Sequence, residues 1–133
     1  MLLRVFLVED SPALCAHLTE ILVNEAKVEI VSVAETEAQA IDWLSRNADG
    51  WDIALVDLFL REGTGVGVVQ HCHERRSDQS IFVMTNHVLN DALLHHCKLL
   101  GADAVYHKGN ELDDLVANCI GLAARRPRGL FSK

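Results

Sequence analysis

Five short apolar runs recur along the chain, separated by longer segments of mixed polarity. The runs are rich in valine and isoleucine, and each is three to six residues long: LRVFLV at 3–8, VEIVSV at 28–33, IALV at 53–56, IFVM at 81–84 and AVY at 104–106. Runs of this length and composition favour buried β-strands over helices. The pattern therefore predicts five strands.

The segments between these runs place apolar residues at helical spacing. Ser11 followed by Pro12, and Thr36 with Gln39, are typical helix starts. Segment 61–74 contains three glycines and three valines, which predicts a loop followed by a weak third helix. Strand followed by helix, repeated five times, predicts a doubly wound α/β domain whose parallel sheet is covered on both faces.

The length and composition predict one compact domain. The chain has 133 residues and half of them are apolar. We expect the domain to span residues 1–124 and residues 125–133 to form a basic tail or the start of a linker, because Pro127 and Gly129 should stop the final helix. No apolar run has the length of a membrane span, and the N-terminal residues turn acidic too early for a secretory signal. A cytoplasmic protein without membrane insertion is therefore expected.

The charge is unevenly distributed along the chain. The net charge is −7, but the last nine residues hold four of the twelve lysines and arginines. Residues 1–124 therefore carry eight basic against 19 acidic side chains, a net charge of −11. So acidic a body argues against direct binding of nucleic acid.

The cysteines and histidines are not expected to bind a metal. The four cysteines are widely spaced within predicted helices, which favours reduced core thiols over disulfides. The clusters HCH at 71–73 and HHC at 95–97 offer few convergent ligands, because adjacent residues on a helix diverge by about 100°. His17, His87 and His107 have no evident partner in the sequence.

Polar side chains follow four of the five predicted strands. Glu9 and Asp10 follow the first strand, Asp57 the third, Thr85 the fourth and Lys108 the fifth. Ligands of a doubly wound sheet bind beyond the carboxyl ends of the strands, so we expect these side chains to share one site. An acidic pair at a strand end is, by itself, more often a solvated turn, but the other three residues favour a functional site.

Three gathered carboxylates need a counter-charge. Within about 5 Å of one another they would repel by roughly 3 kcal/mol per pair at an effective dielectric constant near 20. Mg²⁺, which is usually held by carboxylates, waters and phosphate oxygens, and the ammonium of Lys108 would offset this repulsion. The site is thus predicted to handle a phosphoryl group: Asp57 would attack phosphorus in line and become an aspartyl phosphate, and Thr85 would donate to the transferred group.

These residues resemble the response-regulator receiver domain of bacterial two-component signalling systems. The matching pieces are LVEDSP, ALVDLFLREGTG, VMTN and GADAVYHKG, in the family's order and close to its spacing, and the resemblance covers residues 3–124. It implies a flavodoxin-like fold with a five-stranded parallel sheet of order 2-1-3-4-5 and five helices. It also implies a phosphorylation-dependent switch, which catalyses only its own phosphorylation and slow dephosphorylation.

The resemblance also assigns roles to the site residues. Asp57 would accept the phosphoryl group from a histidine kinase or a histidine phosphotransfer protein. Asp10 would bind Mg²⁺ directly, Glu9 would do so mainly through water, and the backbone carbonyl of Phe59 would complete the protein ligands. Mn²⁺ would substitute for Mg²⁺. Lys108 would pair with the phosphoryl group.

The chain departs from the family at the switch residues. Family members usually carry an aromatic residue three positions before the lysine, where this chain has Val105, followed by Tyr106. Because strand side chains alternate faces, Tyr106 should point away from Thr85, which by resemblance moves toward the phosphoryl group on activation. Gly109 stands where the family commonly has proline, so we expect a looser loop there.

Three rim positions influence, in this family, how quickly the phosphoryl group is lost. They are occupied here by Phe59, Asn86 and His87. A bulky and partly apolar rim is expected to slow the attack of water on the phosphoryl group.

Three functions are compatible with these residues. The first is a single-domain receiver that binds a downstream protein through the face of its fourth helix, fifth strand and fifth helix, with residues His95, His96, Tyr106 and Asp113. The second is the receiver fragment of a longer DNA-binding response regulator or hybrid kinase. The third, a phosphatase using an aspartyl phosphate, is disfavoured because the common hydrolase pattern places a second aspartate where this chain has Phe59.

Overall fold

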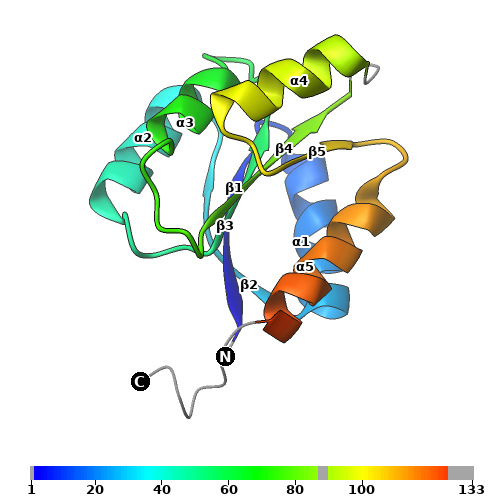
Figure 1. Cartoon of the computed structure of the whole chain (residues 1–133). Helices are drawn as coiled ribbons and strands as arrows, with labels where there is room; N and C mark the ends of the chain where they lie inside the picture. Colours follow the sequence, from blue (N-terminus) through cyan, green and yellow to red (C-terminus); the bar gives the residue numbers. More distant parts are fainter. Residues whose placement is uncertain (1, 87–89, 126–133) are drawn as a thin grey trace.

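The computed structural model describes residues 2–86 and 90–125, which form a parallel five-stranded sheet flanked by five helices (Figure 1). The sheet order is β2-β1-β3-β4-β5. The strands are β1 (Leu3–Val8), β2 (Val28–Ala34), β3 (Ile53–Asp57), β4 (Ser80–Thr85) and β5 (Ala104–His107). The helices are α1 (Pro12–Ala26), α2 (Glu37–Arg46), α3 (Gly65–His71), α4 (Asp91–Leu100) and α5 (Leu112–Arg125). The predicted topology is confirmed, and every strand ends within one residue of its apolar run.

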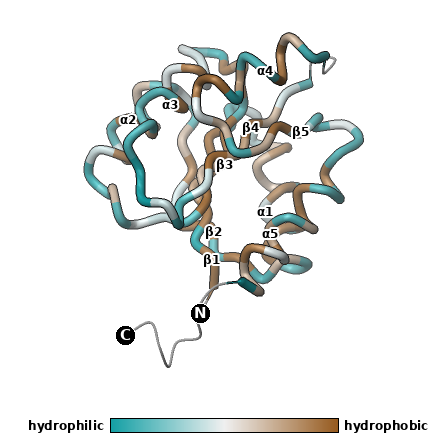
Figure 2. The backbone as a smooth tube through the Cα atoms, in the orientation of Figure 1, coloured by the Kyte–Doolittle hydropathy of each residue, from teal (hydrophilic) through white to brown (hydrophobic). Residues whose placement is uncertain are grey.

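Two apolar cores lie on opposite faces of the sheet. Leu7 and Leu55 pack on the face covered by α1 and α5, whereas Phe6, Val56 and Val83 pack on the face covered by α2, α3 and α4 (Figure 1). Figure 2 shows the central strands as hydrophobic along most of their length. Burial on both faces explains why these strands are continuous apolar runs rather than alternating ones.

The predicted helix starts are also confirmed. The Ser11 hydroxyl accepts a hydrogen bond from the Leu14 N–H (3.3 Å) at the start of α1, and the Thr36 hydroxyl accepts one from the Gln39 N–H (3.1 Å) in α2. The third helix is short, as its glycines predict: α3 has seven residues and is capped by Thr64.

The start of α3 packs directly against the end of β3. A Cβ atom on Gly65 would lie 2.2 Å from the carbonyl oxygen of Asp57, so only glycine fits at this position. The Gly65 N–H donates to the Leu58 carbonyl (3.0 Å). This close approach confines residues 58–64 to a tight loop beside the carboxyl end of β3.

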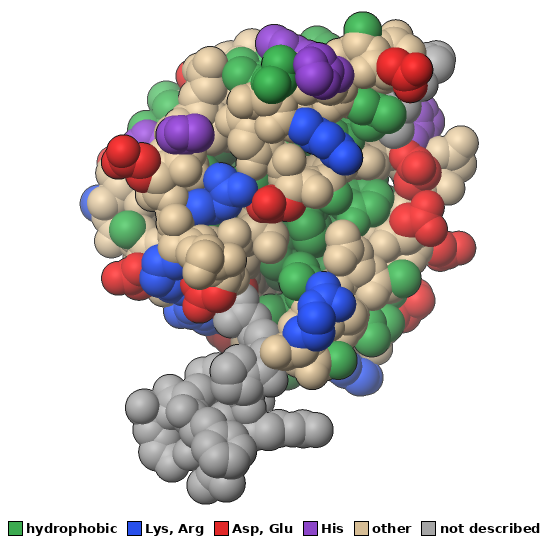
Figure 3. Space-filling model, viewed as in Figure 1, with side chains coloured by type: hydrophobic (Ala, Val, Ile, Leu, Met, Phe, Trp, Pro, Cys, Tyr) green, Lys and Arg blue, Asp and Glu red, His purple; other side chains and the backbone are tan. Residues whose placement is uncertain are grey.

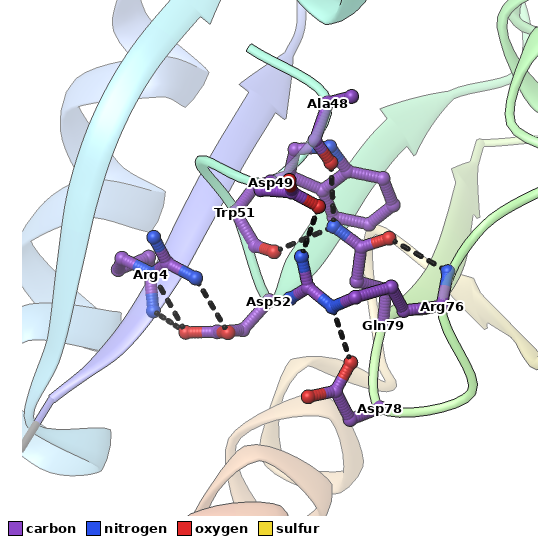
Figure 4. Close-up of polar contacts among 8 residues, drawn as sticks. All are labelled: Arg4, Ala48, Asp49, Trp51, Asp52, Arg76, Asp78 and Gln79. Carbon is purple, nitrogen blue, oxygen red and sulfur yellow. Dashed lines mark hydrogen bonds and ion pairs between the residues drawn. The ribbon is translucent and has the colours of Figure 1, made fainter. Parts of the chain in front are cut away.

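At the amino ends of the strands, opposite the carboxyl ends just described, a polar network holds the sheet together (Figure 4). Asp52, just before β3, accepts hydrogen bonds from the backbone N–H of Arg4 (2.7 Å) and from its guanidinium (3.2 Å to each oxygen). The buried amide of Gln79, just before β4, donates to the carbonyls of Ala48 and Trp51. These contacts tie the starts of β3 and β4 to β1 and to the loop before β3.

Several further expectations concern the whole chain. All four cysteines are free, and three of them are buried. Within the described ranges, no helix is long and apolar enough to cross a membrane. The predicted division between a domain at 1–124 and a tail stays a prediction: α5 ends at Arg125, and the remaining tail residues lie outside the described part of the chain.

Candidate phosphoacceptor site

A pocket of about 500 Å³ opens at the carboxyl edge of the sheet. Six residues predicted from the sequence line it: Glu9, Asp10, Asp57, Phe59, Asn86 and Lys108. The remaining lining residues are Ser11, Leu14 and Gly109. Residues from the ends of four strands, β1, β3, β4 and β5, thus meet in one cavity, as the topology predicts.

Lys108 joins two of the acidic residues inside the pocket. Its Nζ lies 2.7 Å from Glu9 Oε1 and 2.8 Å from Asp57 Oδ2. The side chains of Lys108, Glu9 and Asp57 are 8%, 1% and 5% exposed, so these ion pairs are largely shielded from water. The other oxygen of each acid accepts a backbone N–H: Ser11 donates to Glu9 (3.0 Å) and Phe59 donates to Asp57 (3.2 Å).

The three carboxylates form a compact acidic group. One oxygen from each of Glu9, Asp10 and Asp57 lies within 4.8 Å of the others. In the described part of the chain, no other group of three or more His, Cys, Asp or Glu side chains could hold a metal ion. Hard carboxylate oxygens at this spacing match the ligands that Mg²⁺ prefers.

Burial and ion pairing shift two pKa values in the pocket. Burial raises the pKa of Glu9 above its ordinary value, although hydrogen bonds from Lys108 and Ser11 oppose the shift. Burial alone would lower the pKa of Lys108, but its contacts with Asp57 and Glu9 outweigh burial and raise it. Lys108 therefore stays charged, while Glu9 holds a proton more tightly than an exposed glutamate.

The backbone of the loop after β3 donates hydrogen bonds to two carboxylates from other parts of the chain. The Arg61 N–H donates to Asp10 Oδ2, and the Thr64 N–H donates to Glu37 Oε1 (2.8 Å) at the start of α2. No sequence pattern marks the role of Glu37, because its carboxylate binds the backbone of a distant loop rather than a residue of its own helix. This loop carries Phe59, whose side chain is 51% exposed at the pocket.

The switch residues occupy both faces of the sheet. Thr85 is fully buried, and Val105 packs with the core beneath α2, α3 and α4. Tyr106 faces the opposite core, where its ring meets Phe82 edge-on and its hydroxyl accepts a hydrogen bond from Asn118. The predicted orientation of Tyr106 away from Thr85 is thus confirmed.

His107, for which the sequence suggests no partner, has two: its ring contacts the Asn86 carbonyl and the Gly109 N–H. The looser loop expected at Gly109 stays a prediction. Neither contact was predictable from the sequence, since both involve backbone groups of loops. His87, the third rim residue, lies outside the described residues.

The comparisons with known proteins agree with this geometry. A family model described as the response regulator receiver domain matches residues 5–119. Among solved structures, the receiver domain of NarL from Mycobacterium tuberculosis has a TM-score of 0.78 at 19% identity, and the match covers 94% of this chain and 98% of that one. The response regulator domain of CheB from Thermotoga maritima has a TM-score of 0.79 at 14% identity, covering 96% and 100%. The CheX–CheY complex from Borrelia burgdorferi has a matching chain with a TM-score of 0.79 at 17% identity, covering 91% and 89%. None of the curated proteins matches the chain.

Proposed function

Because this chain belongs to the response regulator receiver domain family, we propose that it is a signalling switch controlled by phosphorylation of Asp57. The phosphoryl group would come from a histidine kinase or a histidine phosphotransfer protein, and the output would be binding of a downstream protein in the cytoplasm. The observation that carries the proposal is the buried Asp57–Lys108 pair (2.8 Å) in a pocket shared with two further carboxylates.

The chain's own residues would share the work of phosphoryl transfer. An Asp57 oxygen would form the bond to phosphorus while the bond from phosphorus to the donor nitrogen breaks. The Lys108 ammonium would neutralise charge on the transferred group, and the hydroxyl of Thr85 would donate to it. Burial of Asp57 and Lys108 strengthens these interactions, because they act in a medium of lower dielectric constant than water.

Mg²⁺ fits the acidic group. Glu9, Asp10 and Asp57 would hold the ion, together with the backbone carbonyl of Phe59. When bound, the ion would supply the positive charge that offsets both the clustered carboxylates and the phosphoryl oxygens. Mn²⁺ has the same preference for oxygen ligands and would substitute.

Intact-mass measurement after incubation with acetyl phosphate tests the proposal. We expect one phosphoryl adduct that requires Mg²⁺ and is absent from Asp57→Asn. Asp42→Asn, which changes an exposed aspartate on α2, serves as the matched control and should be labelled like the wild type. Labelling that persists in Asp57→Asn, or no labelling of the wild type, would overturn the proposal.

The rim of the pocket should set the lifetime of the phosphorylated state. Phe59 stands at the pocket with half of its side chain exposed, where a ring restricts the approach of water. We predict that Phe59→Asn shortens the lifetime about fivefold, which corresponds to roughly 1 kcal/mol in the barrier to hydrolysis. Decay of the intact-mass adduct measures the lifetime, with Phe59→Leu as a variant that keeps an apolar rim. Equal lifetimes for Phe59→Asn and the wild type would contradict the role of the rim.

The proposed output surface is the face formed by α4, β5 and α5. Figure 3 shows histidine side chains gathered over α4 and acidic side chains near the start of α5. His95, His96 and Asp113 are exposed, as a binding surface requires. Tyr106, which was assigned to the same surface, is only 6% exposed, so that assignment was wrong.

A further inference from the structure

The imidazole of His107 connects Asn86 and Gly109, two residues that line the pocket. Its Nδ1 accepts a hydrogen bond from the Gly109 N–H (3.0 Å), in the loop after β5. Because Nδ1 is an acceptor, the ring proton lies on Nε2, which donates to the Asn86 carbonyl (3.1 Å) in the loop after β4. Both contacts are made at once by the neutral ring.

The position of His107 in the sheet explains how the ring reaches both loops. His107 is in register with Thr85 on the neighbouring strand, so the two side chains project from the same face. The backbone of His107 is fixed by Glu111, whose carboxylate accepts its N–H (2.7 Å) and whose own N–H donates to its carbonyl (3.0 Å). The ring therefore extends from a rigid base beside Thr85.

Gly109 is shaped to receive this ring. A Cβ atom at position 109 would lie 3.0 Å from His107 Cε1 and 3.2 Å from Nδ1, tighter than an ordinary contact. Proline at this position would have no N–H to donate. The ring thus links residues 107 and 109 and fixes the backbone on both sides of Lys108.

We propose that His107 is a positioning residue, which holds the Lys108 ammonium against Asp57 and Glu9 and couples it to Asn86, the residue after Thr85. The inference rests on the proposed function of Asp57. The Lys108 N–H already donates to the Thr85 carbonyl (2.9 Å), so backbone and imidazole together tie the end of β4 to the lysine. A shift at Thr85 would carry Asn86 with it and reach Lys108 through the ring. This route does not need an aromatic residue at position 105.

Phosphorylation kinetics with acetyl phosphate test the positioning role. We expect His107→Phe, which removes both hydrogen bonds of the ring, to lower the maximal rate of adduct formation about fivefold, the low end of the range expected for the loss of two exposed hydrogen bonds. His107→Asn keeps an acceptor near Gly109, and His107→Gln keeps a donor near Asn86, so each should restore part of the rate. His17→Phe, which removes an exposed histidine on α1, should leave the rate unchanged.

A double-mutant cycle separates positioning of Lys108 from a general effect on folding. In a Lys108→Gln background, His107→Phe should cause no further loss of rate, because the group that it positions is already absent. A further loss as large as in the wild type would overturn the inference. So would a wild-type rate for His107→Phe, which would leave the proposed function itself intact.

Nitrogen chemical shifts of the His107 ring provide a test that needs no phosphorylation. At neutral pH we expect Nε2 to carry the proton and Nδ1 to be free of it, and we expect this preference to be lost in Gly109→Pro. A dominant Nδ1-protonated tautomer in the wild type would overturn the inference. If the wild type formed no adduct, the proposed function would fail, and the tautomer would still decide whether the ring bridges the loops.

Discussion

At the scale of single residues, the pocket sets one ammonium group against three carboxylates. Lys108 contacts Glu9 and Asp57, whereas Asp10 accepts a hydrogen bond from the backbone of Arg61. The acidic group therefore keeps an excess of negative charge, and Glu9 is its most deeply buried member. The raised pKa of Glu9 follows from this burial.

This shift makes the binding of Mg²⁺ sensitive to pH. Without metal, the folded protein keeps the Glu9 proton at pH values where the unfolded chain has lost it, above 4.5. The proton's contribution to stability is thus complete below 4.5 and is lost as the pH rises through the raised pKa. Mg²⁺ binds the deprotonated carboxylate, so its affinity changes with pH in the opposite direction.

We predict that the affinity for Mg²⁺ weakens as the pH falls from about 8 to about 5, and that the weakening begins above the range of an ordinary glutamate. The affinity at each pH is measured by titration with Mg²⁺ at constant ionic strength, with amide chemical shifts as the readout. Glu9→Gln should bind more weakly at neutral pH but lose the part of the pH dependence that comes from this carboxyl. An affinity that stays constant down to about pH 5 would show that protonation of Glu9 does not compete with the binding of Mg²⁺.

The part of the site that sheet topology brings together was predictable from the sequence. Asp57 ends β3, and Glu9 and Lys108 directly follow β1 and β5, so the prediction of parallel strands was enough to place the three together. The bridging role of His107 was not predictable, because its partners are the backbone groups of Asn86 and Gly109. Such contacts depend on loop conformation, which leaves no periodic pattern in the sequence.

At the scale of elements, the first residue of α2 holds the loop after β3 in place through hydrogen bonds. The Glu37 carboxylate accepts the Thr64 N–H (2.8 Å), and its backbone N–H donates to the Glu62 carbonyl (3.2 Å). A Cβ atom on Gly67 would lie 2.0 Å from Glu37 Oε2, so this glycine makes room for the carboxylate. Gly67, one of the glycines that predict a weak third helix, thus serves the contact of α3 with α2.

Glu37 and Gly67 should therefore be coupled energetically. We predict that Glu37→Ala lowers the free energy of unfolding by about 1 kcal/mol, because the start of α3 loses an acceptor. Gly67→Ala should be neutral or destabilising in the wild type, where the methyl group displaces the carboxylate, yet stabilising by up to about 1 kcal/mol in Glu37→Ala, where helix propensity alone acts. Urea unfolding of the four proteins measures the coupling, and additive effects would show that the two residues do not interact.

At the scale of the whole molecule, the functional pocket and the stabilising polar network lie at opposite ends of the strands. The carboxyl edge holds the pocket, while the amino edge holds the network of Arg4, Asp52 and Gln79 (Figure 4). Glu9, just after β1, lies five positions after Arg4, which corresponds to about 16 Å in an extended strand. The parallel sheet and the edge that holds the pocket follow from the apolar runs, and the strand order follows from the family resemblance. The network follows from neither, since Asp52 and Gln79 lie in turns without periodicity.

The distance between the edges makes stability separable from phosphorylation. Asp52 is 5% exposed and accepts three hydrogen bonds from Arg4, so Asp52→Asn should lower the free energy of unfolding by about 2 kcal/mol. Asp49→Asn alters an aspartate whose side chain is 85% exposed and paired with Arg76, and should change stability by less than about 0.5 kcal/mol.

Both variants should be phosphorylated at the wild-type rate at a temperature where they are fully folded. Their substitutions lie at the amino edge, too far from the pocket to affect its chemistry. Urea unfolding and adduct formation with acetyl phosphate, measured on the same samples, provide the two readouts. A slower rate in folded Asp52→Asn would mean that strain at the amino edge reaches the pocket through β1 or β3. These two strands would then link the edges as one mechanical unit, rather than serve as a rigid frame between two independent ends.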